Sequence, residues 1–279
     1  LILAIGVNVA VLGYFKYAKF VLTNWMSLFD IPGAVDDITL PLGISFFTFT
    51  QIAYLIDTRR GLAGRAGLPE YLLFTTYFPH LLAGPILNYQ EMMPQIRKCA
   101  EKPFEWRYIA VGLTVFFIGL YKKLVLADGV AVFVGPAFDS VARGEALSFA
   151  DAWGAALAYS LQIYLDFSGY SDMAIGLSYL FRMSLPINFN SPYKAKNIID
   201  FWRRWHISLS RFLRDYIYIP LGGNRRGAVR RYANLGLTML IGGAWHGANW
   251  TFVDWGELHG IFLMINTQWI SLCRREGLQ

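Results

Sequence analysis

The strongest constraint in this sequence is a set of long stretches that contain no charged residue. Residues 38–56, 71–90 and 232–253 form three such stretches of 19, 20 and 22 residues. An α-helix rises about 1.5 Å per residue, so roughly 20 residues cross the ~30 Å hydrocarbon layer of a bilayer. The three stretches therefore predict membrane-spanning helices.

Shorter apolar runs add to this pattern at residues 1–15, 108–121, 152–165 and 258–273. Lysine or arginine at their ends can snorkel to the membrane surface and help a short run to span. Hydrophobic residues make up 55% of the chain and charged residues 16%, against about 25% charged in soluble domains. This composition excludes a disordered chain, a coiled coil and most water-soluble enzymes. It predicts an all-α, polytopic integral membrane bundle.

The chain shows no internal repeat and no low-complexity linker, so residues 1–279 are expected to form a single transmembrane domain. It opens at Leu1 inside an apolar run, without the basic region of a signal peptide. We therefore expect a domain trimmed at both ends. Cys99 and Cys273 have neither the number for a disulfide framework nor the spacing of metal ligands, so no metal site is predicted.

Basic residues suggest how the chain is oriented. Residues 186–231 hold ten Lys or Arg and two Asp, a net charge of +8 in a chain of +6. Because cytoplasmic loops of membrane proteins are rich in Lys and Arg, we expect this region at the cytosolic face of the membrane. Gly and Pro within the apolar runs predict a lined cavity, since lipid does not satisfy exposed backbone groups.

The clearest periodicity lies in residues 197–218. Apolar residues follow one another at steps of four and three, which places them on one stripe of a helix: Ile198, Trp202, Trp205, Leu209, Phe212 and Tyr216. Arginines occupy the other side, and Asn197 is a plausible N-cap. Such a helix lies in the membrane interface. Its arginines either anchor anionic lipid or attract a phosphate-bearing substrate, including through Arg203 and Arg204.

His246 is the strongest candidate for chemistry. It lies within the uncharged run 232–253, and ionisable groups at such depth usually face a bundle interior or a wet cavity. Small residues lie one turn before it, and Asn249, one turn after it, is placed to orient the ring or bind an oxyanion. The alternative is helix packing, because Gly243 and Gly247 form a G-x-x-x-G pair.

The other histidines and two aspartates are more ambiguous. His206 falls at the edge of the apolar stripe, away from the arginines, where a structural and a working histidine are equally compatible with the pattern. Asp166 and Asp172 fit a proton path, a cation site or, preferably, a capping or network role. His80 is expected to satisfy a kink, and His259 to lie at an interface.

Several motifs are absent. The sequence has no G-x-S-x-G elbow, no P-loop and no H-E-x-x-H, and none of its histidines has the H-x-x-x-x-D spacing. Nucleic-acid recognition is not predicted, because the basic region is amphipathic and membrane-bound.

Several motifs, in order along most of the chain, resemble the membrane-bound O-acyltransferase (MBOAT) family, and most of all its bacterial alginate O-acetylation branch. They are the residues at 166–172 (DFSGYSD), 188–193 (NFNSPY), 200–209 (DFWRRWHISL) and 242–250 (GGAWHGANW), with 79–85 (PHLLAGP) and 41–46 (PLGISF). The resemblance implies a helical bundle around a central funnel. By position it assigns His246 as the catalytic histidine and His206 as a second signature position.

The resemblance further implies transfer of an acetyl or other acyl group from a cytosolic thioester donor to hydroxyls of an exported polysaccharide such as alginate, with a periplasmic partner finishing the transfer. The donor is acetyl-CoA or an acyl carrier, and no bound cofactor is expected. Arg203 and Arg204 are assigned to its phosphates, and tryptophans to the acyl passage. The full set of predicted substrate-binding residues is Trp202, Arg203, Arg204, Trp205, Trp245, Asn249, Asp166, Tyr170 and Asp172.

Other functions stay open. Within the enzyme class, D-alanyl transfer to teichoic acid is the main rival. Buried His and Asp with broken helices also suit a proton-coupled transporter, although no inverted repeat is visible. A scaffold for envelope-synthesis proteins is the third possibility. A neutral imidazole at His246 would act as general base or as nucleophile.

Overall fold

The computed structural model describes residues 1–81, 84–99 and 103–277. Within these residues the chain forms helices and no strands, which confirms the all-α prediction. The helices group into two compact units. The first holds Leu1–Thr76, Asn88–Gln90 and the described part of Asn190–Gln279, and the second holds the described parts of Tyr77–Leu87 and Glu91–Phe189. The prediction of a single transmembrane domain stays a prediction.

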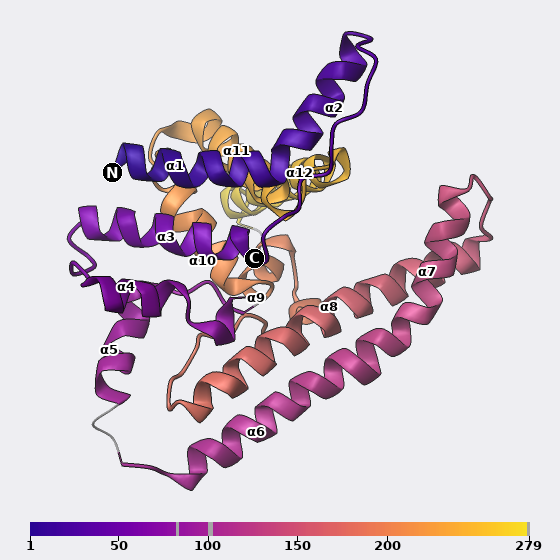
Figure 1. Ribbon diagram of the computed structural model, residues 1–279. Helices are drawn as coiled ribbons and strands as arrows, with labels where there is room; N and C mark the ends of the chain where they lie inside the picture. The colour runs from indigo at the N-terminus through magenta and orange to yellow at the C-terminus, as the bar shows by residue number, and fades with distance from the viewer. Residues whose placement is uncertain (82–83, 100–102, 278–279) are drawn as a thin grey trace. The chain divides into compact units, whose positions relative to one another are not determined.

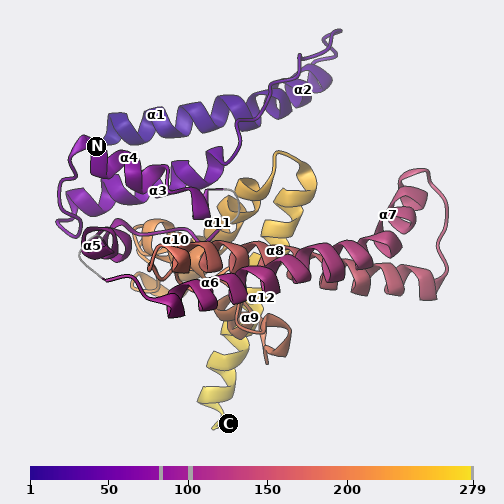
Figure 2. The same ribbon diagram turned by 60° about the horizontal axis from the view of Figure 1, so that its bottom comes forward.

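The first unit is built on a long N-terminal helix and a C-terminal hairpin. Helix α1 (Ile2–Leu12) continues through a π-helical turn (Gly13–Tyr17) into α2 (Ala18–Leu28), and α3 (Ile44–Arg59) packs along α1 (Figures 1 and 2). Helix α4 (Leu68–Thr75) follows. Toward the C-terminus, α11 (Gly227–His246) pairs with α12 (Trp250–Arg275). The short helices α9 (Ile198–Arg204) and α10 (Ile207–Leu213) lead into this hairpin.

The second unit is dominated by a hairpin of long helices. Helix α6 (Trp106–Tyr121) passes through a π-helical turn (Lys122–Ala127) into α7 (Asp128–Ala142), and α8 (Phe149–Leu180) returns along both (Figures 1 and 2). Close contact depends on glycine: a Cβ on Gly119 would stand 2.5 Å from the carbonyl oxygen of Gly169. Helix α5 (Tyr89–Cys99) begins in the first unit and continues in the second.

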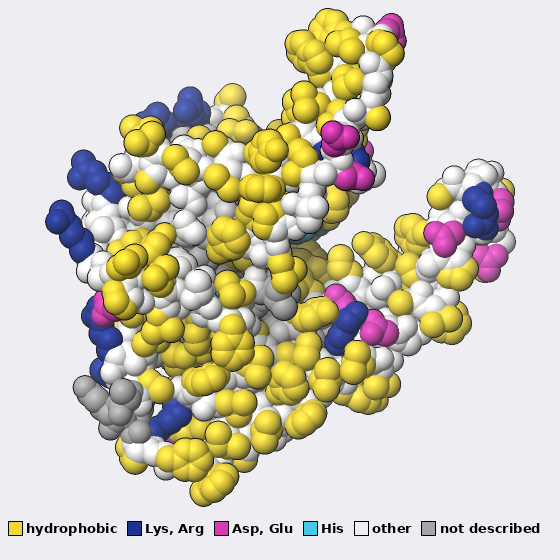
Figure 3. Space-filling model, viewed as in Figure 1, with side chains coloured by type: hydrophobic (Ala, Val, Ile, Leu, Met, Phe, Trp, Pro, Cys, Tyr) yellow, Lys and Arg dark blue, Asp and Glu magenta, His cyan; other side chains and the backbone are white. Residues whose placement is uncertain are grey.

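Two continuous helices among the described residues are long and apolar enough to cross a membrane, Ile2–Leu28 and Trp106–Ala142. Their large apolar side chains face outward: Val132 and Phe133 are 69% and 72% exposed. Hydrophobic side chains cover much of the visible face over these helices (Figure 3). Because soluble proteins rarely expose contiguous apolar surface, this surface fits a lipid environment.

Two expectations about the apolar runs are wrong. Residues 71–90 are not one helix, since α4 ends at Thr75, a 3₁₀ turn spans Phe78–His80 and α5 begins at Tyr89. Pro79 lies in that turn, and proline supplies no N–H to continue a helix. Residues 232–253 are divided between α11 and α12, because Gly247 is extended. The run 152–165 is helical as expected, within the longer helix α8 that continues to Leu180.

The amphipathic segment 197–218 is also interrupted. Asn197 caps α9 as predicted, its side chain accepting a 2.9 Å hydrogen bond from the Asp200 N–H. The helix ends at Arg204, and His206 takes a left-handed backbone conformation (φ 42°) before α10 starts. The apolar stripe still faces inward, with Trp202, Trp205, Leu209 and Phe212 buried. The break therefore changes the direction of the chain without exposing the stripe.

Candidate functional site around His246

The helix that carries His246 is held against α12 by glycine. A Cβ on Gly243 would stand 2.3 Å from the carbonyl oxygen of Phe252, and one on Gly256 would stand 2.7 Å from that of Met239. These separations are far below van der Waals contact, so the two backbones touch only because side chains are absent. Gly243 therefore has the predicted role in helix packing. It lies one turn before His246, so this packing also fixes the position of the histidine.

His246 is the last residue of α11, and the structure fixes its tautomer. Its Nδ1 lies 2.7 Å from the carbonyl oxygen of Gly242. A carbonyl oxygen only accepts hydrogen bonds, so Nδ1 carries the proton and donates. In the neutral ring, Nε2 then keeps a lone pair. The ring is half-buried, and no hydrogen bond to Nε2 occurs among the described residues.

The end of α11 is tied to the π-helical turn of the first long helix. Tyr17 donates its hydroxyl to the carbonyl oxygen of Ala244 at 2.6 Å, and the Lys16 ammonium donates to the carbonyl oxygen of Trp245. The last four carbonyls of a helix have no partner inside it, so these two bonds satisfy groups that would otherwise stay open. They also fix the position of the residues next to His246.

A cavity of about 480 Å³ borders His246. It is lined by the N-terminal helix and by the chain just after α11, including Phe15, Lys16, Phe20, Asn24 and Gly247. Lys19, also on the cavity, is paired with Asp37. A half-buried imidazole with an open lone pair therefore faces a space large enough for a small organic group.

His246 also contacts a cluster of aromatic rings. Its ring centroid lies 4.7 Å from that of Trp255 and 5.1 Å from that of Trp245. Trp255 in turn lies 4.5 Å from His259, which lies 5.2 Å from Trp202. The indole N–H groups of Trp202 and Trp245 and the Nδ1 of His259 are buried without a hydrogen-bond partner among the described residues. Such groups are costly unless water or a ligand satisfies them.

His206 is completely buried and lies 6.0 Å, ring to ring, from Trp245. Burial lowers the pKa of His206 well below its usual value, with a smaller contribution from His246. The ring is therefore neutral at physiological pH. His206 was predicted to lie away from the arginines, and the structure places it in the protein interior. The two histidines of the family motifs share one aromatic cluster through Trp245.

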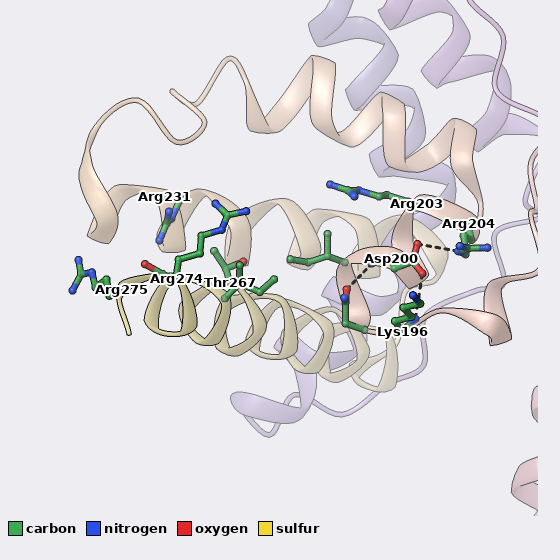
Figure 4. Close-up of a pocket in the computed structure, with 12 residues that line it drawn as sticks. Lys196, Asp200, Arg203, Arg204, Arg231, Thr267, Arg274 and Arg275 are labelled. Carbon is green, nitrogen blue, oxygen red and sulfur yellow. Dashed lines mark hydrogen bonds and ion pairs between the residues drawn. The ribbon is translucent and has the colours of Figure 1, made fainter. Parts of the chain in front are cut away.

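A second, strongly basic cavity of about 800 Å³ lies between α9 and the C-terminal hairpin (Figure 4). Figure 4 shows Arg231, Arg274 and Arg275 at one end and Lys196, Arg203 and Arg204 at the other. Asp200 is the one acidic residue among the described residues that line it. This basic cavity is suited to a multiply charged anion such as a phosphate or diphosphate.

The two adjacent arginines predicted to bind phosphate differ in their contacts. Arg204 forms an ion pair with Asp200 at 2.9 Å, which holds the pKa of the Asp200 carboxyl below its usual value. Among the described residues no carboxylate pairs with Arg203. Arg203 is thus available to a ligand, whereas Arg204 is partly neutralised.

A third cavity, of about 570 Å³, lies beside the basic one. Both are lined by Ile199 and Arg203, and the third cavity is also lined by Trp202, Met239 and Leu263. Because Trp202 contacts His259 and Trp255, the aromatic cluster reaches from this third cavity to His246. Arg211 and Arg214 also line the third cavity, so it combines an apolar wall with positive charge.

Other predicted site residues have structural contacts. Asn249 caps α12, accepting from the Thr251 N–H at 3.1 Å, so it does not continue the face of α11. Asp166, Tyr170 and Asp172 lie inside α8 in the second unit. The two carboxylates pair with lysines, Asp166 with Lys123 at 2.7 Å and Asp172 with Lys122 at 2.5 Å, in agreement with a network role.

Trp255 was not predicted as a site residue, and His259 was expected only at an interface. The two residues are one turn apart on α12, and that spacing between an aromatic and an imidazole was the available signal. Lys16 and Tyr17 gave no signal, because their partners lie more than 220 positions away. The predicted kink role of His80 is confirmed, since its Nδ1 donates to the carbonyl oxygen of Tyr77 at 2.7 Å.

Comparison with known proteins is consistent with this site. The model of the membrane-bound O-acyltransferase family, MBOAT, matches residues 5–279. The chain is 48% identical to the peptidoglycan O-acetyltransferase of Helicobacter pylori, over 99% of this chain and 56% of that protein. It is 45% identical to the probable alginate O-acetylase AlgI of Pseudomonas putida, over 95% and 54%.

A more distant relative is the teichoic acid D-alanyltransferase of Streptococcus thermophilus, 29% identical over 82% of this chain and 57% of that protein. The chain thus spans little more than half the length of the relatives it matches.

Proposed function

This chain belongs to the membrane-bound O-acyltransferase family. We therefore propose that it transfers an acetyl group from a thioester donor to a hydroxyl group. The hydroxyl group belongs to a cell-envelope polysaccharide, or to a partner protein that passes the acetyl group on to such a polysaccharide. The observation that carries the proposal is the His246 ring, which donates through Nδ1, keeps a lone pair on Nε2 and lines a cavity. The O-acetyltransferase names of relatives at 45–48% identity favour acetyl as the acyl group.

In this proposal His246 is a general base. Its Nε2 takes the proton of the acceptor hydroxyl as the oxygen attacks the thioester carbonyl carbon. The carbon–oxygen bond forms and the carbonyl electron pair moves to oxygen. When the intermediate collapses, the carbon–sulfur bond breaks and the imidazolium returns its proton to the leaving thiolate. The Nδ1–H to Gly242 bond keeps the ring in the tautomer that this step requires.

The donor is proposed to bind from the side of α9. Phosphates of coenzyme A or of an acyl-carrier arm occupy the basic cavity, where Arg203, Arg231 and Arg274 supply positive charge. The pantetheine arm follows the apolar wall of the adjacent third cavity past Trp202 toward His246. The buried N–H groups of Trp202 and Trp245 are available donors for its amide oxygens. The donor is a substrate, and the proposal includes no bound cofactor.

The acceptor is proposed to use the cavity that borders His246 on the side of the N-terminal helix. Entry of donor and acceptor from different sides suits a multi-pass protein of the bacterial inner membrane that serves an exported polymer such as alginate, with a periplasmic O-acetyltransferase or an export protein as partner. The membrane-bound family and the exposed apolar surface of Trp106–Ala142 support the membrane location.

The test uses the complete protein in inverted membrane vesicles with radiolabelled acetyl-CoA or acetylated carrier protein. We expect transfer of label to polysaccharide or partner protein, and its loss in His246→Ala at unchanged protein level in the membrane. Normal transfer by His246→Ala would contradict the proposal. So would a polymer whose acetyl ester content does not depend on His246, which is the behaviour expected of a scaffold.

The D-alanyl alternative is tested in the same assay. A D-alanyl thioester on its carrier is offered beside the acetyl donor. We expect acetyl to be transferred and D-alanine to be left on its carrier. Preferential transfer of D-alanine would retain the role of His246 and replace the proposed donor.

A further inference from the structure

A lysine lies beside the candidate catalytic histidine without a carboxylate to neutralise it. Lys16 lines the same cavity as His246 and is half-buried. Its ammonium donates to the carbonyl oxygen of Trp245 and, at 3.2 Å, to the Ser45 hydroxyl. No carboxylate pairs with it among the described residues, whereas Lys19 on the same cavity is paired with Asp37. Partial burial of an ammonium group without a counter-charge has an unfavourable free energy. A role in helix packing alone therefore does not account for a lysine at this position.

The position of Lys16 is fixed by an unusual backbone. It lies in the π-helical turn Gly13–Tyr17 between α1 and α2. A π-turn inserts a residue into an α-helix and is frequent at functional sites. Here it directs two neighbouring side chains, Lys16 and Tyr17, to consecutive carbonyl oxygens at the end of α11. Tyr17 does not line the cavity, so the two residues share one structural role but differ in access to a ligand.

The Lys16 ammonium has one N–H group that forms no hydrogen bond among the described residues. A protonated lysine carries three N–H groups, of which two are used by Trp245 and Ser45. Nζ also lies 5.5 Å from the centroid of the Trp245 ring. The third N–H has no acceptor oxygen among the described residues. Because the residue after Trp245 is His246, this donor is anchored to the backbone that carries the reacting imidazole.

We propose that Lys16 is a further catalytic residue, whose free N–H donates to the oxyanion that forms when an acceptor attacks the thioester beside His246. This inference rests on the proposed function. In the step described above, the carbonyl electron pair moves to oxygen, and the Lys16 ammonium stabilises that charge. Lys16 keeps its own proton throughout, so the balance of the reaction is unchanged. A fixed donor in a site sheltered from water typically contributes 10²–10³-fold to turnover.

The test compares Lys16→Gln with Tyr17→Phe in the complete protein. Glutamine keeps an N–H donor for the end of α11 but loses the charge. Tyr17→Phe removes only the neighbouring bond to α11. We expect kcat to fall about 100-fold in Lys16→Gln with the donor KM within about twofold of wild type, and to fall by less than about threefold in Tyr17→Phe. Similar small losses in both variants would reduce Lys16 to a helix-end contact and overturn the proposal.

Chemical rescue separates a catalytic role of Lys16 from a structural one, because an added amine restores turnover only if the ammonium group itself acts in the reaction. In Lys16→Ala the cavity has room for a small amine, and we expect methylammonium to restore turnover in proportion to its concentration. No restoration in folded, membrane-inserted Lys16→Ala would contradict the proposal. If Lys16→Gln fails to insert, Lys16→Arg replaces it. The arginine variant keeps the charge and is expected to retain at least about a tenth of the wild-type kcat, and a complete loss in folded protein would overturn the proposal.

Failure of this inference is distinct from failure of the proposed function. A wild-type protein whose transfer does not depend on His246 contradicts the proposed function. An active wild type that loses transfer in His246→Ala but not in Lys16→Gln contradicts only the role of Lys16.

Discussion

His246 donates its Nδ1–H to the carbonyl oxygen of Gly242, one helical turn earlier, across 2.7 Å. The acceptor is a backbone atom, so the tautomer does not depend on another side chain. We expect the ¹⁵N chemical shifts of selectively labelled His246 to indicate a protonated Nδ1 and an unprotonated Nε2 at neutral pH. The opposite tautomer would remove the base from the proposed mechanism.

Glycines on α11 are expected to differ sharply in tolerance. In Gly243→Ala the new Cβ would stand 2.3 Å from the Phe252 carbonyl oxygen, a backbone atom that does not move aside. We expect this variant to lose about 1–3 kcal/mol of stability and most of its activity. Gly236→Ala is the control, because its nearest neighbour is the flexible end of Met264 at 3.8 Å. Thermal unfolding in detergent checks both, and equal melting temperatures would contradict the close packing of α11 on α12.

The basic cavity is tested with two adjacent arginines of one helix. Arg231 lines this cavity, whereas Arg230 is exposed and does not. A charge-assisted hydrogen bond to phosphate contributes about 1.5–3 kcal/mol, so we expect Arg231→Ala to raise the donor KM about tenfold or more. Arg230→Ala is expected to leave it within about twofold. Equal donor KM values in both variants, measured with acetyl-CoA, would favour the lipid-anchor interpretation of these arginines.

Asn249 is expected to act through helix α12 and not through the substrate. Its side chain accepts from the Thr251 N–H, and loss of such a cap costs about 1 kcal/mol. Asn249→Ser preserves the cap, so we expect it to keep both stability and kcat, while Asn249→Ala loses stability. If Asn249→Ser folds normally but loses turnover, the predicted oxyanion or ring-orienting role of Asn249 is correct and the cap is secondary.

His206 is expected to make the protein sensitive to acid. Burial lowers its pKa well below the reference value of 6.5, so below about pH 6.5 the unfolded chain binds a proton that the folded chain does not. Stability therefore falls as pH drops below 6.5, by at most about 1.4 kcal/mol per pH unit from this group. His206→Asn tolerates the left-handed backbone and has no such proton. Melting temperatures at pH 7 and pH 5 should differ less in this variant than in wild type.

Local patterns in the sequence predicted much of this site. Asn197 was predicted to cap a helix because its side chain precedes an apolar stripe, and it does so. The edge of that stripe placed His206 away from the arginines, and the structure shows it buried. His246 stood out because an imidazole in an uncharged run is costly. Each of these inferences uses residues within one or two helical turns, where spacing determines geometry.

Helix breaks were predicted poorly, because hydropathy does not record backbone conformation. The runs 71–90 and 232–253 are uncharged throughout, but Pro79 and Gly247 lie where their helices are interrupted. The left-handed His206 divides a stripe that is periodic on both sides of it. In α8 the helix continues through charged residues. Asp166 and Asp172 are tolerated inside it because lysines neutralise them.

The amino-acid sequence alone determined that the chain is helical, that it is rich in long apolar runs, and that one imidazole lies within an uncharged run, because each property depends on near neighbours. Only the tertiary structure decided what surrounds that imidazole. Lys16 and Tyr17 reach the end of α11 from the other end of the chain, and Trp255 and His259 turn toward His246 only because Gly243 and Gly256 allow two backbones to touch. Contacts of this kind depend on how distant segments pack, which no local pattern of residues encodes.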